Sequence, residues 1–161
     1  DRTYIRAQVD ELGHMTLISR YRGSSYIHHD WLKLSVGDLY VDTPESKDRH
    51  EFTDLGVYYE WLSFINGNDG GAAAFISANK DANITYTLYR KTGPDSSRPV
   101  YRNLKLNKDD RYAIASLYDL SQVLLTLNEH KNLREEADRH LKFIRSKMKD
   151  ESTEEGVEED K

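Results

Sequence analysis

The hydrophobic periodicity of the chain changes near residue 106, and this change constrains the fold more than any other feature. Before it, apolar and polar residues alternate in short runs, which is the pattern of half-buried strands. In the run 31–36, Leu32, Leu34 and Val36 share one face. After it, apolar residues recur every three or four positions, as on an amphipathic helix. We therefore expect an α+β fold, in which an antiparallel β-sheet of six to eight strands, sandwich- or barrel-like, packs against C-terminal amphipathic helices.

Turn signals divide the first 106 residues into strands. Gly37-Asp38 stands between two apolar runs and predicts a tight hairpin, because glycine adopts positive φ without steric cost. The segment 44–54 is polar and predicts a long loop, and the alanine-rich segment 72–78 predicts a short helix. The remaining predicted strands cover residues 3–9, 14–21, 26–36, 39–41, 58–65, 83–90 and 100–106.

The helical region carries two apolar stripes that do not share one face. Asn107 is the expected N-cap. The first stripe comprises Ala113, Leu117, Leu120, Leu124 and Leu127, and the second Leu133, Ala137, Leu141, Ile144 and Met148. At about 100° per residue the second stripe starts about 240° round the helix. This offset predicts a break near residues 128–132, with the second helix folding back. The alternative is one long helix whose distal half binds a partner.

The charge divides the chain into a body and a tail. The net charge is −5, and residues 150–161 contribute −6 through seven acids and one base, which leaves +1 for residues 1–149. We expect residues 1–149 to form a single α+β domain, strand-rich over 1–106 and helical over 107–149, and residues 150–161 to form an acidic, flexible tail. The basic segment 131–149 precedes that tail directly, so we do not expect nucleic acid as the partner.

Several kinds of chemistry lack support in the sequence. The chain has no cysteine, which excludes disulfides and thiolate sites. No apolar run approaches the ~20 residues that span a bilayer. Neither a glycine-rich phosphate loop nor a Gly-x-Ser-x-Gly motif occurs, and we expect no cofactor. The chain begins at Asp1 rather than methionine, so we expect a removed N-terminal segment, which fits either a cleaved leader or a trimmed cytosolic protein. We favour an extracytoplasmic or secreted location over a cytoplasmic one.

The triplet His28-His29-Asp30 is the most suggestive polar motif. On a strand, His28 and Asp30 would point to one face, where they could supply two ligands to a zinc-type site. His14 or His50 could supply the third ligand. The alternative, which we prefer, is a polar strand face beside an apolar one. The charged segment 48–51 is expected to be a solvated loop.

Aromatic side chains give the strongest indication of function. We expect Trp31, Tyr40, Tyr59 and Trp61 to form a binding surface if they are exposed, or a core beneath the helices if they are buried. The favoured function is a non-catalytic interaction domain, secreted or surface-associated, that binds a protein or glycan partner. One alternative is a small inhibitor or immunity-type protein that neutralises its partner. Another is a metal-assisted hydrolase that uses His28 and Asp30.

Overall fold

The computed structural model describes the backbone of residues 2–158 and the side chains of residues 2–153. It comprises two compact units, Asp1–Leu124 and Leu125–Lys161. The first unit contains all the strands, both short helices and the beginning of a long helix. The second unit is the continuation of that helix.

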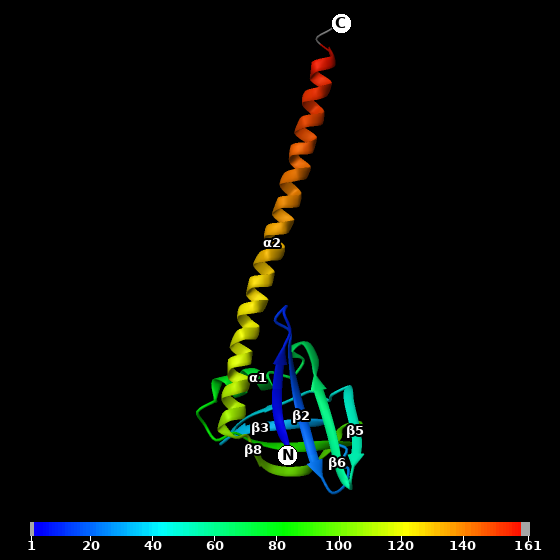
Figure 1. The fold of residues 1–161 in the computed structure, drawn as a ribbon, viewed down its shortest axis with the longest axis vertical. Coiled ribbons are helices and arrows are strands. Elements are labelled where there is room, and N and C mark those ends of the chain that lie inside the picture. The colour runs from blue at the N-terminus through cyan, green and yellow to red at the C-terminus, as the bar shows by residue number, and fades with distance from the viewer. Residues whose placement is uncertain (1, 159–161) are drawn as a thin grey trace. The chain divides into compact units, whose positions relative to one another are not determined.

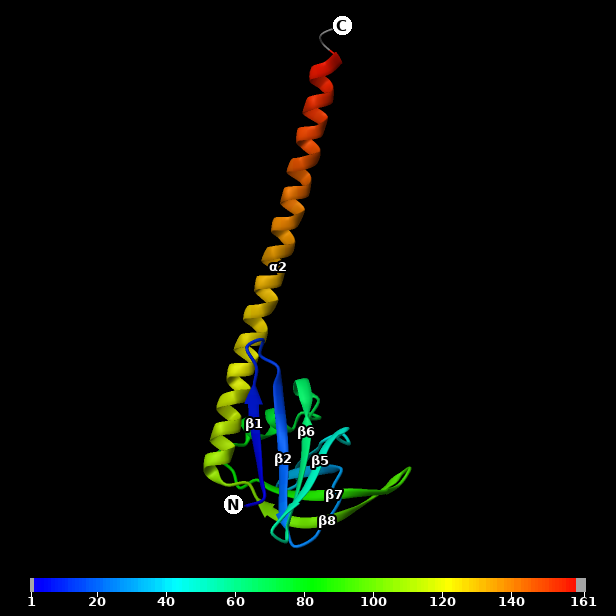
Figure 2. The same ribbon diagram turned by 45° about the vertical axis from the view of Figure 1, so that its right-hand side comes forward.

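Two antiparallel sheets of four strands form the body of the first unit (Figure 1). One sheet has the order β1-β2-β6-β5, with strands Tyr4–Val9, Met15–Gly23, Val57–Phe64 and Asp48–Asp54. The other has the order β4-β3-β7-β8, with strands Leu39–Asp42, Trp31–Val36, Thr85–Gly93 and Ser96–Lys105. The strands of the second sheet run across those of the first (Figure 2). The α+β fold is therefore confirmed, and because neither sheet closes on itself it is sandwich-like.

Side chains from both inner sheet faces form one hydrophobic core. Leu17 and Leu62 come from the first sheet, and Leu34 and Leu88 from the second. Helix α1 (Ala72–Ala78) adds Ala72, Ala73 and Ile76, and the first turns of helix α2 (Lys108–Glu158) add Ile114 and Leu117. The outer faces of both sheets therefore carry side chains that do not belong to this core.

Local signals in the sequence explain the turn and helix positions. Gly37 has φ +57° in the β3–β4 hairpin, as predicted. The Asp69 carboxylate accepts hydrogen bonds from the amides of Gly71 and Ala73 at the start of α1, both at 2.9 Å. Asn107 Oδ1 accepts a hydrogen bond from the Asp110 amide at 2.7 Å, which confirms it as the cap of α2. A 3₁₀ turn, η1 (Ile65–Gly67), follows β6.

Two predicted boundaries are wrong. Residues 48–54 form strand β5 instead of a loop, because an edge strand tolerates charged side chains. Residues 26–30 are irregular and do not extend β3, whose first residue is Trp31. His28 has φ +53°, in the left-handed region and outside the range of regular strand backbone, so the face assigned to His28 by alternation does not apply.

The predicted break near residues 128–132 is also wrong, because α2 continues from Lys108 to Glu158. The offset between the two apolar stripes forces no break, because within the second unit Leu133, Leu141, Ile144 and Met148 are all exposed and need not meet a core. Binding of a partner by this distal half stays a prediction. Residues 150–158 of the acidic segment belong to α2, and residues 159–161 lie outside the described residues.

No helix in the described part of the chain has the length and apolar character that crossing a bilayer requires.

Candidate functional site

The connection between β2 and β3 is held by a single buried carboxylate. Glu60 lies on the inner face of β6 and is fully buried. Its Oε1 accepts hydrogen bonds from the amides of Ile27 and His28, at 2.6 and 2.7 Å. Its Oε2 accepts hydrogen bonds from the amide and the Nδ1 of His29, at 3.1 and 2.6 Å. Three consecutive residues of an irregular segment are thereby fixed to one strand.

Glu60 is ionised in this environment. Burial alone would raise the pKa of its carboxyl group. The hydrogen bond from the His29 side chain, the amides of His28 and His29 and the charge of His29 oppose that effect and lower the pKa of Glu60 to about 2. The four hydrogen bonds explain how a carboxylate is tolerated beside an apolar core.

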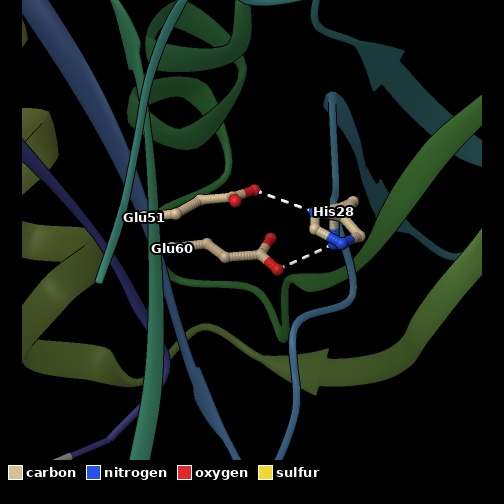
Figure 3. Close-up of side chains that lie close together, drawn as sticks. All are labelled: His28, Glu51 and Glu60. Carbon is tan, nitrogen blue, oxygen red and sulfur yellow. Dashed lines mark hydrogen bonds and ion pairs between the residues drawn. The ribbon is translucent and has the colours of Figure 1, made fainter. Parts of the chain in front are cut away.

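His28 lies between two carboxylates that come from neighbouring strands. Glu51 on β5 and Glu60 on β6 are cross-strand partners and both point toward the His28 segment (Figure 3). His28 Nδ1 is 3.0 Å from Glu51 Oε1. The Arg49 guanidinium donates to the same oxygen at 2.7 Å. Burial acts to raise the pKa of Glu51, but the hydrogen bonds from His28 and Arg49 keep it below its usual range.

His28, Glu51 and Glu60 form a group that could hold a metal ion, since their ligand atoms lie within 4.8 Å of one another. The donor set fits a metal poorly. Glu60 already accepts four hydrogen bonds, and the positive charge of Arg49, which donates to Glu51, would repel a metal cation bound beside it. The arrangement is a hydrogen-bonded support for His28 that needs no metal to satisfy it.

The other predicted metal ligands lie apart from this group. The Asp30 carboxylate accepts hydrogen bonds from Arg49 Nη1 and from the Lys91 amide, both at 2.7 Å. His14 is paired with Asp10 at 3.0 Å, and His50 with Asp48 at 3.2 Å. Neither of these histidines belongs to the described group that could hold a metal.

A second constellation resembles a nucleophilic triad in its connectivity. Ser19 Oγ is 3.4 Å from His29 Nε2, and His29 Nδ1 is 2.6 Å from Glu60 Oε2. A serine–histidine–carboxylate chain can activate the serine hydroxyl. All three side chains are 0% exposed, however, so no substrate can reach Ser19 in this conformation. The chain of hydrogen bonds satisfies buried polar groups.

A pocket of about 520 Å³ adjoins the His28 segment. His28 and Asp30 contribute from the β2–β3 connection, Glu45 and Arg49 from the β4–β5 connection and the start of β5, and Arg90, Lys91 and Gly93 from the end of β7. Two carboxylates and three permanent cations therefore surround it. The predicted pair His28 and Asp30 thus lines this pocket.

Arg20, Phe52, Tyr59 and Trp61 form an arginine–aromatic cluster on the outer face of the first sheet. The Arg20 guanidinium lies over the rings of Tyr59 and Trp61, at 4.9 and 5.4 Å from their centroids. Phe52 stacks on the same two rings at 4.7 and 5.1 Å. Because β6 lies between β2 and β5, Arg20 and Phe52 approach these rings from opposite sides.

The other two predicted binding residues lie on the outer face of the second sheet. Trp31 stacks on Tyr89 at 4.0 Å, and Lys33 Nζ lies 4.4 Å from the centroid of Tyr40, which is 62% exposed. The structure therefore places Trp31 and Tyr40 on one sheet and Tyr59 and Trp61 on the other. The four residues do not form one surface.

Sequence reasoning missed Glu60 and Phe52, and it assigned Glu51 to a solvated loop. Glu60 had a signal, because it is the acidic residue on the otherwise apolar inner face of the run 58–64. Phe52 lies on a strand where the sequence predicts a loop, so its face could not be assigned. The partners of Glu60 are 31 to 33 positions away in sequence, which no local pattern reveals.

Searches with this chain against protein-family models, curated proteins and solved structures found no match. Inferences about its function therefore depend on the geometry of the sites described above.

Proposed function

We propose that this chain is a non-catalytic domain that binds a protein partner through the arginine–aromatic cluster of Arg20, Phe52, Tyr59 and Trp61. The stacking of these four side chains on a solvent-facing sheet surface carries the proposal. Tryptophan, tyrosine and arginine dominate the residues that contribute most to protein–protein binding. Mutual stacking restricts these side chains before a partner arrives, which lowers the entropy lost on binding.

The stacking favours a protein over a glycan. A sugar ring needs an open aromatic face on which to lie, whereas Arg20 and Phe52 cover Tyr59 from both sides and leave it 8% exposed. Phe52, at 44% exposed, offers more apolar surface. A protein partner can bury the outer side of Phe52 together with the edges of the other rings.

Leu55 gives a second reason to place the partner contact on the β5–β6 hairpin. It lies in the turn between β5 and β6, is 97% exposed and has φ +47°. An apolar side chain at such a position is unfavourable both for solvation and for backbone conformation. A partner that covers Leu55 and Phe52 would account for a leucine at the tip.

The alternative functions have weaker support. A metal-assisted hydrolase based on His28 and Asp30 would require the Asp30 carboxylate to exchange its present partners, the Arg49 guanidinium and the Lys91 amide, for a metal. An inhibitor or immunity-type protein is a variant of the present proposal, in which binding neutralises the partner. The outer face of the second sheet, which carries Trp31 and Tyr40, provides the control surface for the experiment that follows.

The proposal is tested by partner capture with matched variants. We expect the intact chain to retain a specific protein from its native source and Phe52→Ala to lose most of it, because the exposed ring is removed. Tyr40→Ala removes a more exposed ring from the other sheet and should retain the partner. Equal capture by Phe52→Ala and the intact chain, or binding to a glycan array that Phe52→Ala abolishes, would contradict the proposal.

A further inference from the structure

We propose that the pocket beside His28 binds a phosphate or sulfate group, held by the side chains of His28, Arg90 and Lys91. The pocket volume of about 520 Å³ falls in the range of small-molecule sites. Two of its lining residues, Arg49 and Arg90, lie on the inner faces of their strands, since Arg49 pairs with the buried Leu62 across β5 and β6 and Arg90 follows the buried Leu88 by two residues. The site is separate from the arginine–aromatic cluster, which occupies the outer face.

The ion pairs around the pocket leave three side chains available for an anion. Arg49 is occupied by Asp30 and Glu51, at 2.7 Å each. Lys91 Nζ is 2.8 Å from Glu45, and this pair is exposed and exchangeable. The guanidinium of Arg90 has no ion-pair partner among the described residues. His28 engages Glu51 through Nδ1, which leaves Nε2 for a ligand.

The position of His28 is fixed in advance. Its left-handed backbone, at φ +53°, is held by the hydrogen bonds that Glu60 accepts from the amides of residues 27–29. Strained residues of this kind persist only where the surrounding structure determines them, and they cluster at ligand sites. The buried side chains of Glu60 and His29 thus orient His28, which is half-exposed at the wall of the pocket.

The donors suit a tetrahedral oxyanion better than a metal or a carboxylate. Arg90 and Lys91 come from β7 and His28 comes from the facing connection, so they approach from different directions. A phosphate or sulfate accepts hydrogen bonds on several oxygens at once, and arginine binds it with two parallel bonds. A protonated His28 can donate one N–H to Glu51 and the other to the anion. The cations would repel a metal ion.

The test is a titration of the full chain with inorganic phosphate, sulfate and acetate, followed by NMR of the histidine and arginine side chains. We expect saturable changes in the chemical shifts of His28 and Arg90 with phosphate, with sulfate or with both. The anion that produces these changes shows whether the ligand carries a phosphate or a sulfate group. Arg90→Gln should weaken binding by about tenfold, equivalent to one charge-assisted hydrogen bond. His50→Gln, which changes an exposed histidine on the outer face, should leave binding unchanged.

His28→Gln provides a second variant should Arg90→Gln fail to fold, and it should also weaken binding. Three results would overturn the inference. The first is no saturation at millimolar phosphate or sulfate, and the second is equal binding of acetate. The third is unchanged affinity in folded Arg90→Gln and His28→Gln.

Discussion

Glu60 on β6 accepts a hydrogen bond from the backbone amide of His28 at 2.7 Å, although the two residues are 32 positions apart in sequence. The same carboxylate also binds the amides of Ile27 and His29 and the imidazole of His29. One ionised group therefore joins the first sheet to the connection that leads into the second. The loss of this group should affect both the stability of the fold and the position of His28.

Replacement of Glu60 by glutamine should destabilise the fold. The NH₂ group of the introduced side-chain amide would face the N–H groups of His29, so donors would meet donors in a buried place. Removing one partner of such a network costs about 3 kcal/mol. Urea unfolding measures the change, and Glu51→Gln, at a half-exposed carboxylate, should cost less than about 1 kcal/mol. An unfolding free energy equal to that of the original chain would show that Glu60 has no such role.

The contribution of Glu60 should depend on pH. Its pKa in the folded state is about 2, below the ordinary value of 4.5. A depressed carboxyl pKa stabilises the fold above pH 4.5, and this stabilisation is lost as the pH falls toward 2. The difference in unfolding free energy between the original chain and Glu60→Gln should therefore shrink over this interval, by up to about 3 kcal/mol. A difference that stays constant between these pH values would contradict the assignment.

Replacement of Leu55 by asparagine should stabilise the fold while weakening partner binding. Leu55 and Gly56 have φ +47° and +78°, the signs that a two-residue hairpin turn of type I′ requires. Asparagine tolerates this conformation better than leucine, and we expect a gain of about 1 kcal/mol. Thermal unfolding tests the gain in stability, and partner capture tests the loss of binding. Leu39→Asn, at an exposed residue without positive φ, is the control and should give no gain.

Removal of residues 129–161 should leave the folded body intact. Every described side chain from residue 129 to residue 153 is exposed, so none of these described residues is part of the core. We expect the unfolding free energy of residues 1–128 to stay within about 1 kcal/mol of the full chain. A truncated chain that fails to fold would show that the distal part of α2 contributes to stability.

The elements that were predicted correctly are those specified by neighbouring residues. The Val36–Leu39 hairpin follows from Gly37, the start of α2 follows from Asn107, and the strands 3–9 and 83–90 follow from alternation. In each case the physical cause lies within a few positions of its effect. The antiparallel sheets, each with an apolar inner face and a more polar outer face, follow from the same local patterns.

The features that could not be predicted depend on distant partners. Strand β5 pairs with β6 although its own sequence is charged, so its composition indicates a loop. The amides of the irregular segment 26–30 donate hydrogen bonds to Glu60, a partner in another strand, whereas the sequence of the segment alone indicates that it continues β3. The predicted break in the long helix depends on burial of both apolar stripes, whereas the second stripe is exposed.

Site-specific photocross-linking tests the proposed binding surface most directly. Phe52 is replaced by p-benzoyl-phenylalanine in the full chain, which keeps an aromatic ring at the exposed edge of the cluster, and the protein is irradiated in extracts of its native source. We predict one dominant protein adduct at position 52 and none at the same replacement of Tyr40, the more exposed ring on the other sheet. Adducts at position 40 without any at position 52 would contradict the account.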